Sequence, residues 1–199
     1  MRVSPAYGPA LLRVVFLDRD GVINRDSAEY VKSWGEFEFL PGSLTAMARL
    51  TQAGFSLILI TNQSAVARGL ISRPRLGRLH QRLRTAVAEK GGRIRDIFFC
   101  PHHPDEGCLC RKPAIGLLQQ AAAKYGLDLS EAIFVGDSAK DIHCARAAGC
   151  GQSLLVRTGN GGSALAALQR EGERPDHVAD DLLSAVDWIL RLPTSSAIE

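Results

Sequence analysis

The sequence has no long hydrophobic run and only a small excess of positive charge. In 199 residues, no apolar stretch approaches the roughly 18 to 20 residues that a membrane-spanning helix needs. Lys and Arg number 24 and Asp and Glu number 21, which gives a formal charge of +3, and no basic run is interleaved with aromatic residues. These absences argue against a membrane protein and against a nucleic-acid-binding protein.

The sequence also lacks a secretion signal, and its cysteine count is odd. The five cysteines argue against a disulfide framework. The apolar run near the N-terminus ends at Asp18 with no small-residue cleavage site, so we interpret it as a strand and not as a signal peptide. We therefore expect a cytoplasmic protein, and we expect it to be a monomer.

Short apolar runs alternate with segments of helical periodicity along the whole chain. The runs, typical of parallel strands buried on both faces, are residues 13–18, 55–61, 94–100, 132–137 and 153–158. The expected helices are residues 42–54, 72–92, 115–126, 139–149 and 180–192. This alternation predicts an α/β fold, a Rossmann-like three-layer sandwich with a mostly parallel sheet.

No second core and no large insertion are visible in the sequence. The segment between the first strand and the first helix, about residues 24–40, is too short to form a cap domain. We expect one domain over residues 1–192 and a flexible tail over 193–199. The glycine-rich stretch 157–162 could be a phosphate-binding loop, but we interpret it as a mobile connection.

Polar residues follow the predicted strands where ligands bind in such sheets, at the carboxyl ends. They are Asp18 and Asp20 after the first strand, Thr61 to Ser64 after the second, Lys112 after the third, and Asp137 and Asp141 after the fourth. An Asp after a strand is often only a helix N-cap, but here several such groups converge. Clustered carboxylates repel each other unless a hard divalent cation is bound, which favours Mg²⁺.

Four motifs together resemble those of the haloacid dehalogenase-like phosphatases. They are "FLDRDGVIN", "ITNQS", "CRKP" and "VGDSAKD", between residues 16 and 141. More narrowly, "DRDGVIN", "FLPG", "TNQS", "ARG" and "CPH…C-x-CRKP" resemble the small bacterial heptose bisphosphate phosphatases. The related histidinol-phosphate phosphatases share the cysteine-rich loop.

The resemblance implies a covalent mechanism. Asp18 would attack phosphorus and form an aspartyl phosphate, and Asp20 would act as general acid and then as general base. Thr61 and Lys112 would neutralise the transferring phosphoryl group. Magnesium would be held by the Asp18 carboxylate, the Asp20 carbonyl and Asp137, with Asp141 orienting Lys112 or a metal-bound water.

The cysteine cluster supplies the ligands of a second metal. Cys100, Cys108 and Cys110, with a histidine beside them, are the donor set of a tetrahedral structural zinc site. The resemblance makes His102 the fourth ligand, whereas the role of His103 stays open. The alternative is that the cysteines are clustered by chance or act as a redox sensor.

Loops around the cleft would choose the substrate, because no cap is expected. Arg111 could hold a second phosphate or a carboxylate, and Asn62, Gln63 and Arg68 could bind sugar hydroxyls or a distal phosphate.

The resemblance implies hydrolysis of the 7-phosphate of D-glycero-D-manno-heptose 1,7-bisphosphate on the route to lipopolysaccharide core. One alternative is a histidinol-phosphate phosphatase or another small-molecule phosphatase, and a second is a non-enzymatic zinc-stabilised binding module. Ser138 stands where the heptose enzymes often have lysine, which weakens the inference about the substrate but not about the chemistry.

Overall fold

The computed structural model describes residues 12–193 of the chain. Apart from Pro193, the predicted flexible tail lies outside the described residues. None of the helices within 12–193 has both the length and the apolar character to cross a membrane.

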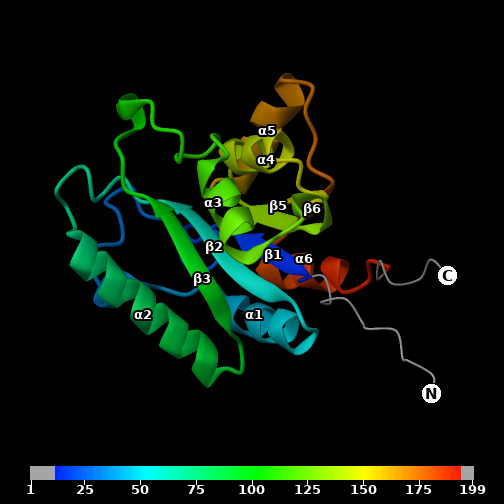
Figure 1. Ribbon diagram of the computed structural model, residues 1–199, viewed down its shortest axis with the longest axis horizontal. Coiled ribbons are helices and arrows are strands. Elements are labelled where there is room, and N and C mark those ends of the chain that lie inside the picture. The colour runs from blue at the N-terminus through cyan, green and yellow to red at the C-terminus, as the bar shows by residue number, and fades with distance from the viewer. Residues whose placement is uncertain (1–11, 194–199) are drawn as a thin grey trace, which may run out of the picture.

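Six parallel strands form one sheet in the order β3-β2-β1-β4-β5-β6 (Figure 1). The strands are β1 (Val14–Leu17), β2 (Ser56–Asn62), β3 (Ile94–Cys100), β4 (Ile133–Gly136), β5 (Gln152–Val156) and β6 (His177–Ala179). The chain moves outward from β1 to β3 in one direction and from β4 to β6 in the other. The direction therefore switches between β1 and β4, and a cleft is expected at the carboxyl ends of these two strands.

Helices cover both faces of the sheet. They are α1 (Ser43–Gln52), α2 (Arg73–Glu89), α3 (Gly116–Tyr125), α4 (Ala139–Ala147), α5 (Gly161–Arg170) and α6 (Leu182–Ile189). Helices α1, α2 and α6 pack on one face and α3, α4 and α5 on the other (Figure 1). Short 3-10 turns occur at Trp34–Glu36, Pro104–Glu106 and Leu129–Glu131. The three-layer α/β prediction is confirmed, and the sheet is parallel throughout.

The alternation of side chains along β1 explains why both faces need helices. Leu17 belongs to the core under α1, α2 and α6, whereas the preceding Phe16 belongs to the core under α3 and α4. Both side chains are fully buried, as is the rest of the strand. A strand with apolar residues at every position is stable only when both faces are covered.

Two elements were not predicted from the sequence. Strand β6 has only three residues and lies at the sheet edge, so its apolar run is too short to stand out. Helix α5 begins at Gly161, inside the stretch interpreted as a mobile connection. The glycines at its first turn hid the helical periodicity that follows them.

One buried histidine makes the stability of the fold depend on pH. His80 on α2 is 6% exposed, and its ring packs edge-on against Phe99 with the centroids 5.7 Å apart. Burial, reinforced by the Arg19 charge, lowers the pKa of His80 from 6.5 to about 3. The neutral ring therefore fits the folded state, and protonation favours unfolding. The stabilisation is present above pH 6.5 and is lost as the pH falls from 6.5 towards 3.

We expect His80→Leu to reduce this acid sensitivity. Between pH 7.5 and pH 5 the variant should lose about 2 kcal/mol less unfolding free energy than the parent protein, because leucine takes up no proton. Urea unfolding at the two pH values measures the difference. The half-exposed His143, which pairs with Glu171, gives the control variant His143→Gln, which should keep the acid sensitivity of the parent. If His80→Leu loses as much unfolding free energy between the two pH values as the parent protein does, this account is contradicted.

Candidate active site

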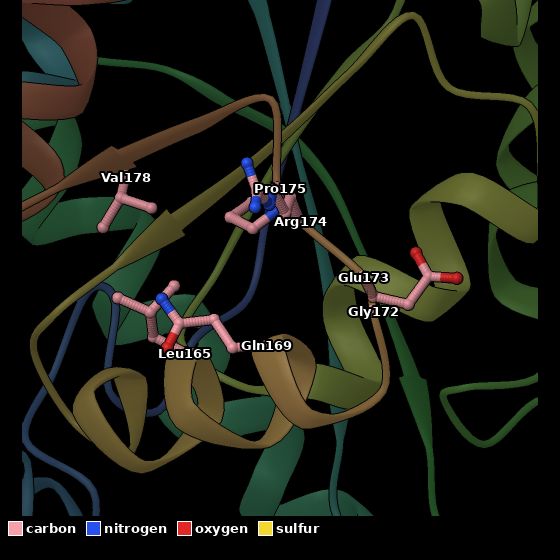
Figure 2. Close-up of a pocket in the computed structure, with 7 residues that line it drawn as sticks. All are labelled: Leu165, Gln169, Gly172, Glu173, Arg174, Pro175 and Val178. Carbon is pink, nitrogen blue, oxygen red and sulfur yellow. The ribbon is translucent and has the colours of Figure 1, made fainter.

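Two clefts of similar size differ in the chemistry of their walls. A cleft of about 630 Å³ lies between α5 and the segment that leads into β6 (Figure 2). Its lining is partly apolar, and two of its polar groups, the Glu173 carboxylate and the Arg174 carbonyl, accept hydrogen bonds from Arg146. None of the predicted site residues lines it.

The second cleft, of about 720 Å³, opens at the carboxyl ends of β1, β2 and β4. The predicted site residues that line it are Asp18, Asp20, Thr61, Asn62, Gln63, Arg68, Arg111 and Asp137. Lys112 is 2% exposed and lies beneath the cleft, in contact with Asp18. The structure thus brings the predicted catalytic, magnesium and substrate residues to one place.

Lys112 is held by three oxygen atoms. Its Nζ lies 3.0 Å from Asp18 Oδ1 and 2.6 Å from Asp141 Oδ1, and it donates a hydrogen bond to the Ile60 carbonyl at 2.8 Å. Burial disfavours the ammonium, but the two carboxylates outweigh it and raise the pKa of Lys112 above its ordinary value. The contact expected between Asp141 and Lys112 is present, so Lys112 presents a fixed positive charge beside Asp18.

The acidic groups of the site outnumber the basic ones. Oxygens of Asp18, Asp137 and Asp141 all lie within 4.8 Å of one another. Burial and the neighbouring carboxylates raise the pKa of Asp18, and Lys112 lowers it. The net effect raises the pKa of Asp18 to about 8. Burial and Asp141 likewise raise the pKa of Asp137 to about 7.

A divalent cation would balance this charge. Counting Asp20 and its partner Arg19, the site holds four carboxylates and two cations, so ionisation of all four carboxylates would leave two negative charges uncompensated. Among the hydrogen bonds of residues 12–193, none reaches Asp18 Oδ2 or Asp137 Oδ1. Free carboxylate oxygens in an oxygen-only site fit Mg²⁺.

A loop that follows β5 completes the site. The backbone N–H of Asn160 donates to Asp137 Oδ2 at 2.8 Å, and its side-chain amide donates to the same oxygen at 3.2 Å. Thr158 donates to the Gly21 carbonyl at 2.6 Å. A Cβ at Gly21 or Gly159 would lie about 2 Å from Asp137 Oδ2, so both positions require glycine. The contacts of Thr158 and Asn160 with the site were not predicted from the sequence, although a glycine-rich stretch after a strand was the signal.

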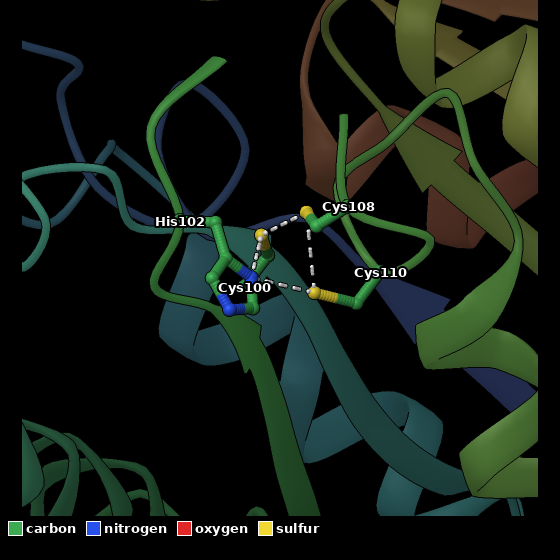
Figure 3. A group of neighbouring side chains, drawn as sticks. All are labelled: Cys100, His102, Cys108 and Cys110. Carbon is green, nitrogen blue, oxygen red and sulfur yellow. Dashed lines mark hydrogen bonds between the residues drawn. The ribbon is translucent and has the colours of Figure 1, made fainter. Parts of the chain in front are cut away.

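The four residues of the predicted zinc site converge on the loop after β3 (Figure 3). Cys100 Sγ lies 3.5 Å from both His102 Nδ1 and Cys108 Sγ, and Cys110 Sγ lies 3.2 Å from the imidazole nitrogen and 3.6 Å from Cys108 Sγ. Zn–S bonds of about 2.3 Å in a tetrahedron place sulfur atoms about 3.8 Å apart. The cluster therefore fits a tetrahedral zinc ion. The His103 ring instead accepts a hydrogen bond from the Asp105 backbone.

Comparison with known proteins identifies the family. A model of HAD-hydrolase-like proteins matches residues 109–185. The D-glycero-beta-D-manno-heptose-1,7-bisphosphate 7-phosphatase of Bordetella bronchiseptica is 44% identical over 90% of this chain and 99% of its own length. That of Pseudomonas aeruginosa is 46% identical over 89% of this chain and 98% of its own. The chain belongs to the D-glycero-D-manno-heptose-1,7-bisphosphate 7-phosphatase family.

A solved heptose bisphosphate phosphatase also matches the fold. The D,D-heptose 1,7-bisphosphate phosphatase from B. bronchiseptica, complexed with magnesium and phosphate, superposes with a TM-score of 0.84 at 44% identity, over 90% of this chain and 99% of that one. The elements described over residues 12–193 include no cap, which confirms the prediction of a haloacid dehalogenase-like fold without one. Membership of this phosphatase family also excludes the zinc-stabilised binding module considered from the sequence.

Within this heptose phosphatase fold, two predicted substrate residues have partners in the protein. The Asn62 amide exchanges two hydrogen bonds with the Lys112 backbone, at 3.1 and 3.2 Å. Gln63 Nε2 donates to Asp20 Oδ2 and to Thr61 Oγ1, each at 2.9 Å. Both amides therefore orient predicted catalytic residues, and binding of the substrate by them stays a prediction.

The two predicted substrate arginines differ in their surroundings. Arg68 lies with its guanidinium carbon 5.9 Å from the centre of the Tyr30 ring. Arg111 Nη1 is buried and has no hydrogen-bond partner within residues 12–193. A buried guanidinium nitrogen without an acceptor is costly, so an anionic ligand would stabilise it.

Proposed function

We propose that this protein hydrolyses the 7-phosphate of D-glycero-D-manno-heptose 1,7-bisphosphate, which releases phosphate and heptose 1-phosphate on the route to lipopolysaccharide core. The proposal rests on one observation above all: the likeness to a heptose-1,7-bisphosphate 7-phosphatase extends over 99% of that protein's length at 44% identity. The cleft with Asp18, Asp20, Lys112 and Asp137 supports the chemistry.

In the first half-reaction, a carboxylate oxygen of Asp18 attacks phosphorus and the bond from phosphorus to the C7 oxygen breaks. Asp20 gives its proton to the departing alkoxide. In the second half-reaction, Asp20 takes a proton from water as the water oxygen attacks the aspartyl phosphate. The Asp18–phosphorus bond breaks, and both aspartates return to their starting state once Asp20 is protonated.

Thr61 and Lys112 would stabilise the phosphoryl group as it is transferred. Thr61 Oγ1 accepts a hydrogen bond from Gln63, which leaves its own proton free for a phosphoryl oxygen. Lys112 supplies a buried positive charge next to Asp18. Magnesium, held by Asp18, the Asp20 carbonyl and Asp137, would neutralise further charge on that group.

The cysteine cluster would hold zinc in a closed, structural site. Cys100, His102, Cys108 and Cys110 supply four ligands, which fills a tetrahedral coordination shell. Arg111 and Lys112 directly follow the last ligand, so the metal would fix the segment that carries both cations.

The distal 1-phosphate of the sugar would bind at Arg111 and Arg68. Both line the cleft that contains Asp18, and the buried Nη1 of Arg111 needs an acceptor. Two cations beyond Lys112 are more than a monophosphate requires, which favours a bisphosphate over histidinol phosphate.

We expect Arg111→Ala to raise KM for heptose 1,7-bisphosphate by about 10- to 150-fold, equivalent to roughly 1.5 to 3 kcal/mol for a charge-assisted contact. Hydrolysis of 4-nitrophenyl phosphate should change much less, because that substrate has no second anion. Steady-state kinetics on both substrates provide the test. Equal slowing of both would place Arg111 at the transferring phosphoryl group and contradict the distal site.

A further inference from the structure

Arg19, between the two aspartates of the first motif, is a charged residue enclosed by the protein. It is 1% exposed, and its guanidinium carbon lies 5.8 Å from the centre of the Phe37 ring. Phe37 belongs to the segment between β1 and α1 and is itself part of the buried core. The Arg19 Nη1 has no hydrogen-bond partner within residues 12–193, so the cost of burying this charge is offset through Nε and Nη2 and their partner.

That partner is the carboxylate of Asp20. Arg19 Nε donates to Oδ1 at 3.1 Å and Nη2 donates to Oδ2 at 2.7 Å, which is the two-point geometry that only arginine provides. Two amides complete the set: Asn24 donates to Oδ1 at 2.9 Å and Gln63 donates to Oδ2 at 2.9 Å. All four contacts donate to the carboxylate, so they fix both oxygens of Asp20 and stabilise its ionised form, which is the form that takes a proton from water.

The arrangement links Asp20 to the rest of the site. The Gln63 amide that donates to Asp20 also donates to Thr61, so the acid–base group and the phosphoryl-binding hydroxyl share one anchor. Asp18 is held separately, by Lys112 and by the Arg19 backbone N–H at 2.7 Å. The Arg19 side chain therefore acts on Asp20 and not on the nucleophile.

We propose that Arg19 is a positioning residue for the reaction, which fixes the Asp20 carboxylate where it can exchange a proton with the sugar oxygen and with the attacking water. This inference rests on the proposed function, since it assigns Arg19 a role through Asp20. The consequence is specific, because proton transfer matters only for some leaving groups. A sugar alkoxide leaves poorly without a proton, whereas 4-nitrophenolate leaves without one.

The test compares kcat/KM for these two kinds of leaving group in Arg19→Lys. Lysine keeps the charge but cannot make the two-point contact. We expect kcat/KM for heptose 1,7-bisphosphate to fall by about 10- to 100-fold, because small displacements of a catalytic group are costly. For 4-nitrophenyl phosphate it should stay within about threefold. Asp20→Asn should show the same selectivity for the alkyl substrate, and adding Arg19→Lys to Asp20→Asn should cause no further loss.

Two comparisons keep the result interpretable. Arg25→Lys is the matched control, because Arg25 pairs with Glu38 at the exposed surface, and it should leave both rates unchanged. Arg19→Gln replaces Arg19→Lys if the lysine variant does not fold, and thermal unfolding establishes that the glutamine variant is folded. Equal losses on both substrates, or a further loss in the Asp20→Asn background, would overturn the proposal. Failure of the parent protein to hydrolyse heptose bisphosphate would instead refute the proposed function, and the Arg19 test would then use an alkyl phosphate that it does hydrolyse.

Discussion

Asp18→Asn is expected to lower kcat by at least about 10⁴-fold at saturating Mg²⁺, while the protein stays folded. The amide has the shape of the carboxylate, and its oxygen can still face Lys112, which contacts Asp18 Oδ1 at 3.0 Å. It cannot attack phosphorus. Rapid quenching followed by mass spectrometry should detect a phosphorylated chain in the parent protein and none in the variant.

The same substitution should not destabilise the metal-free protein. Because burial and neighbouring carboxylates raise the pKa of Asp18 to about 8, its ionised form is unfavourable in the folded state at neutral pH. Removing that charge should leave the thermal midpoint unchanged or higher. Asp187→Asn, at a surface aspartate that pairs with Arg49, is the control and should keep full activity. A near-normal kcat for Asp18→Asn would refute covalent catalysis at this residue.

The second large effect is expected at the cysteine cluster. Protein purified without chelator should contain about one zinc per chain, and Cys108→Ser or Cys110→Ser should lose most of it. Because metal binding contributes to folding free energy, we expect a loss of about 3 kcal/mol or more, or about 6 to 12 °C in the thermal midpoint. Elemental analysis and thermal unfolding measure the two quantities.

The matched control for the zinc ligands is Cys150→Ser, since Cys150 lies outside the cluster. It should keep its zinc. The ligand variants should also raise KM for heptose bisphosphate, because Arg111 and Lys112 directly follow Cys110 in the chain. Absence of zinc from the parent protein would remove the claim of a metal site.

The parts of the site that follow from strand order were predictable from the sequence. Asp18 and Asp137 directly follow the neighbouring strands β1 and β4, and a parallel sheet brings such strand ends to one edge whatever the loops do. The spacing of the cysteines likewise placed four ligands on one loop. These features depend on local pattern, which sequence periodicity reports directly.

Contacts made by long polar side chains were not predictable in the same way. Arg19 occupies an alternating position in the "DRD" motif and gave no sign that it would be buried against Phe37. Asn62 and Gln63 were interpreted as substrate residues. The sequence alone does not distinguish an amide side chain that faces the substrate from one that orients a neighbouring residue. Asn160 reaches Asp137 only because β5 lies beside β4, a contact over 23 residues of chain.

The central claim is that this protein removes the C7 phosphate from heptose 1,7-bisphosphate. The most direct measurement is the hydrolysis of that compound with Mg²⁺, with histidinol phosphate assayed in parallel and the product identified by phosphorus NMR. We expect kcat/KM for the bisphosphate to exceed that for histidinol phosphate by at least about tenfold, since Arg111 and Arg68 favour a second anion. The phosphorus resonance of the C7 phosphate should disappear and that of inorganic phosphate should appear, while the resonance of the anomeric phosphate remains. Faster hydrolysis of histidinol phosphate, or loss of the anomeric phosphate first, would contradict the account.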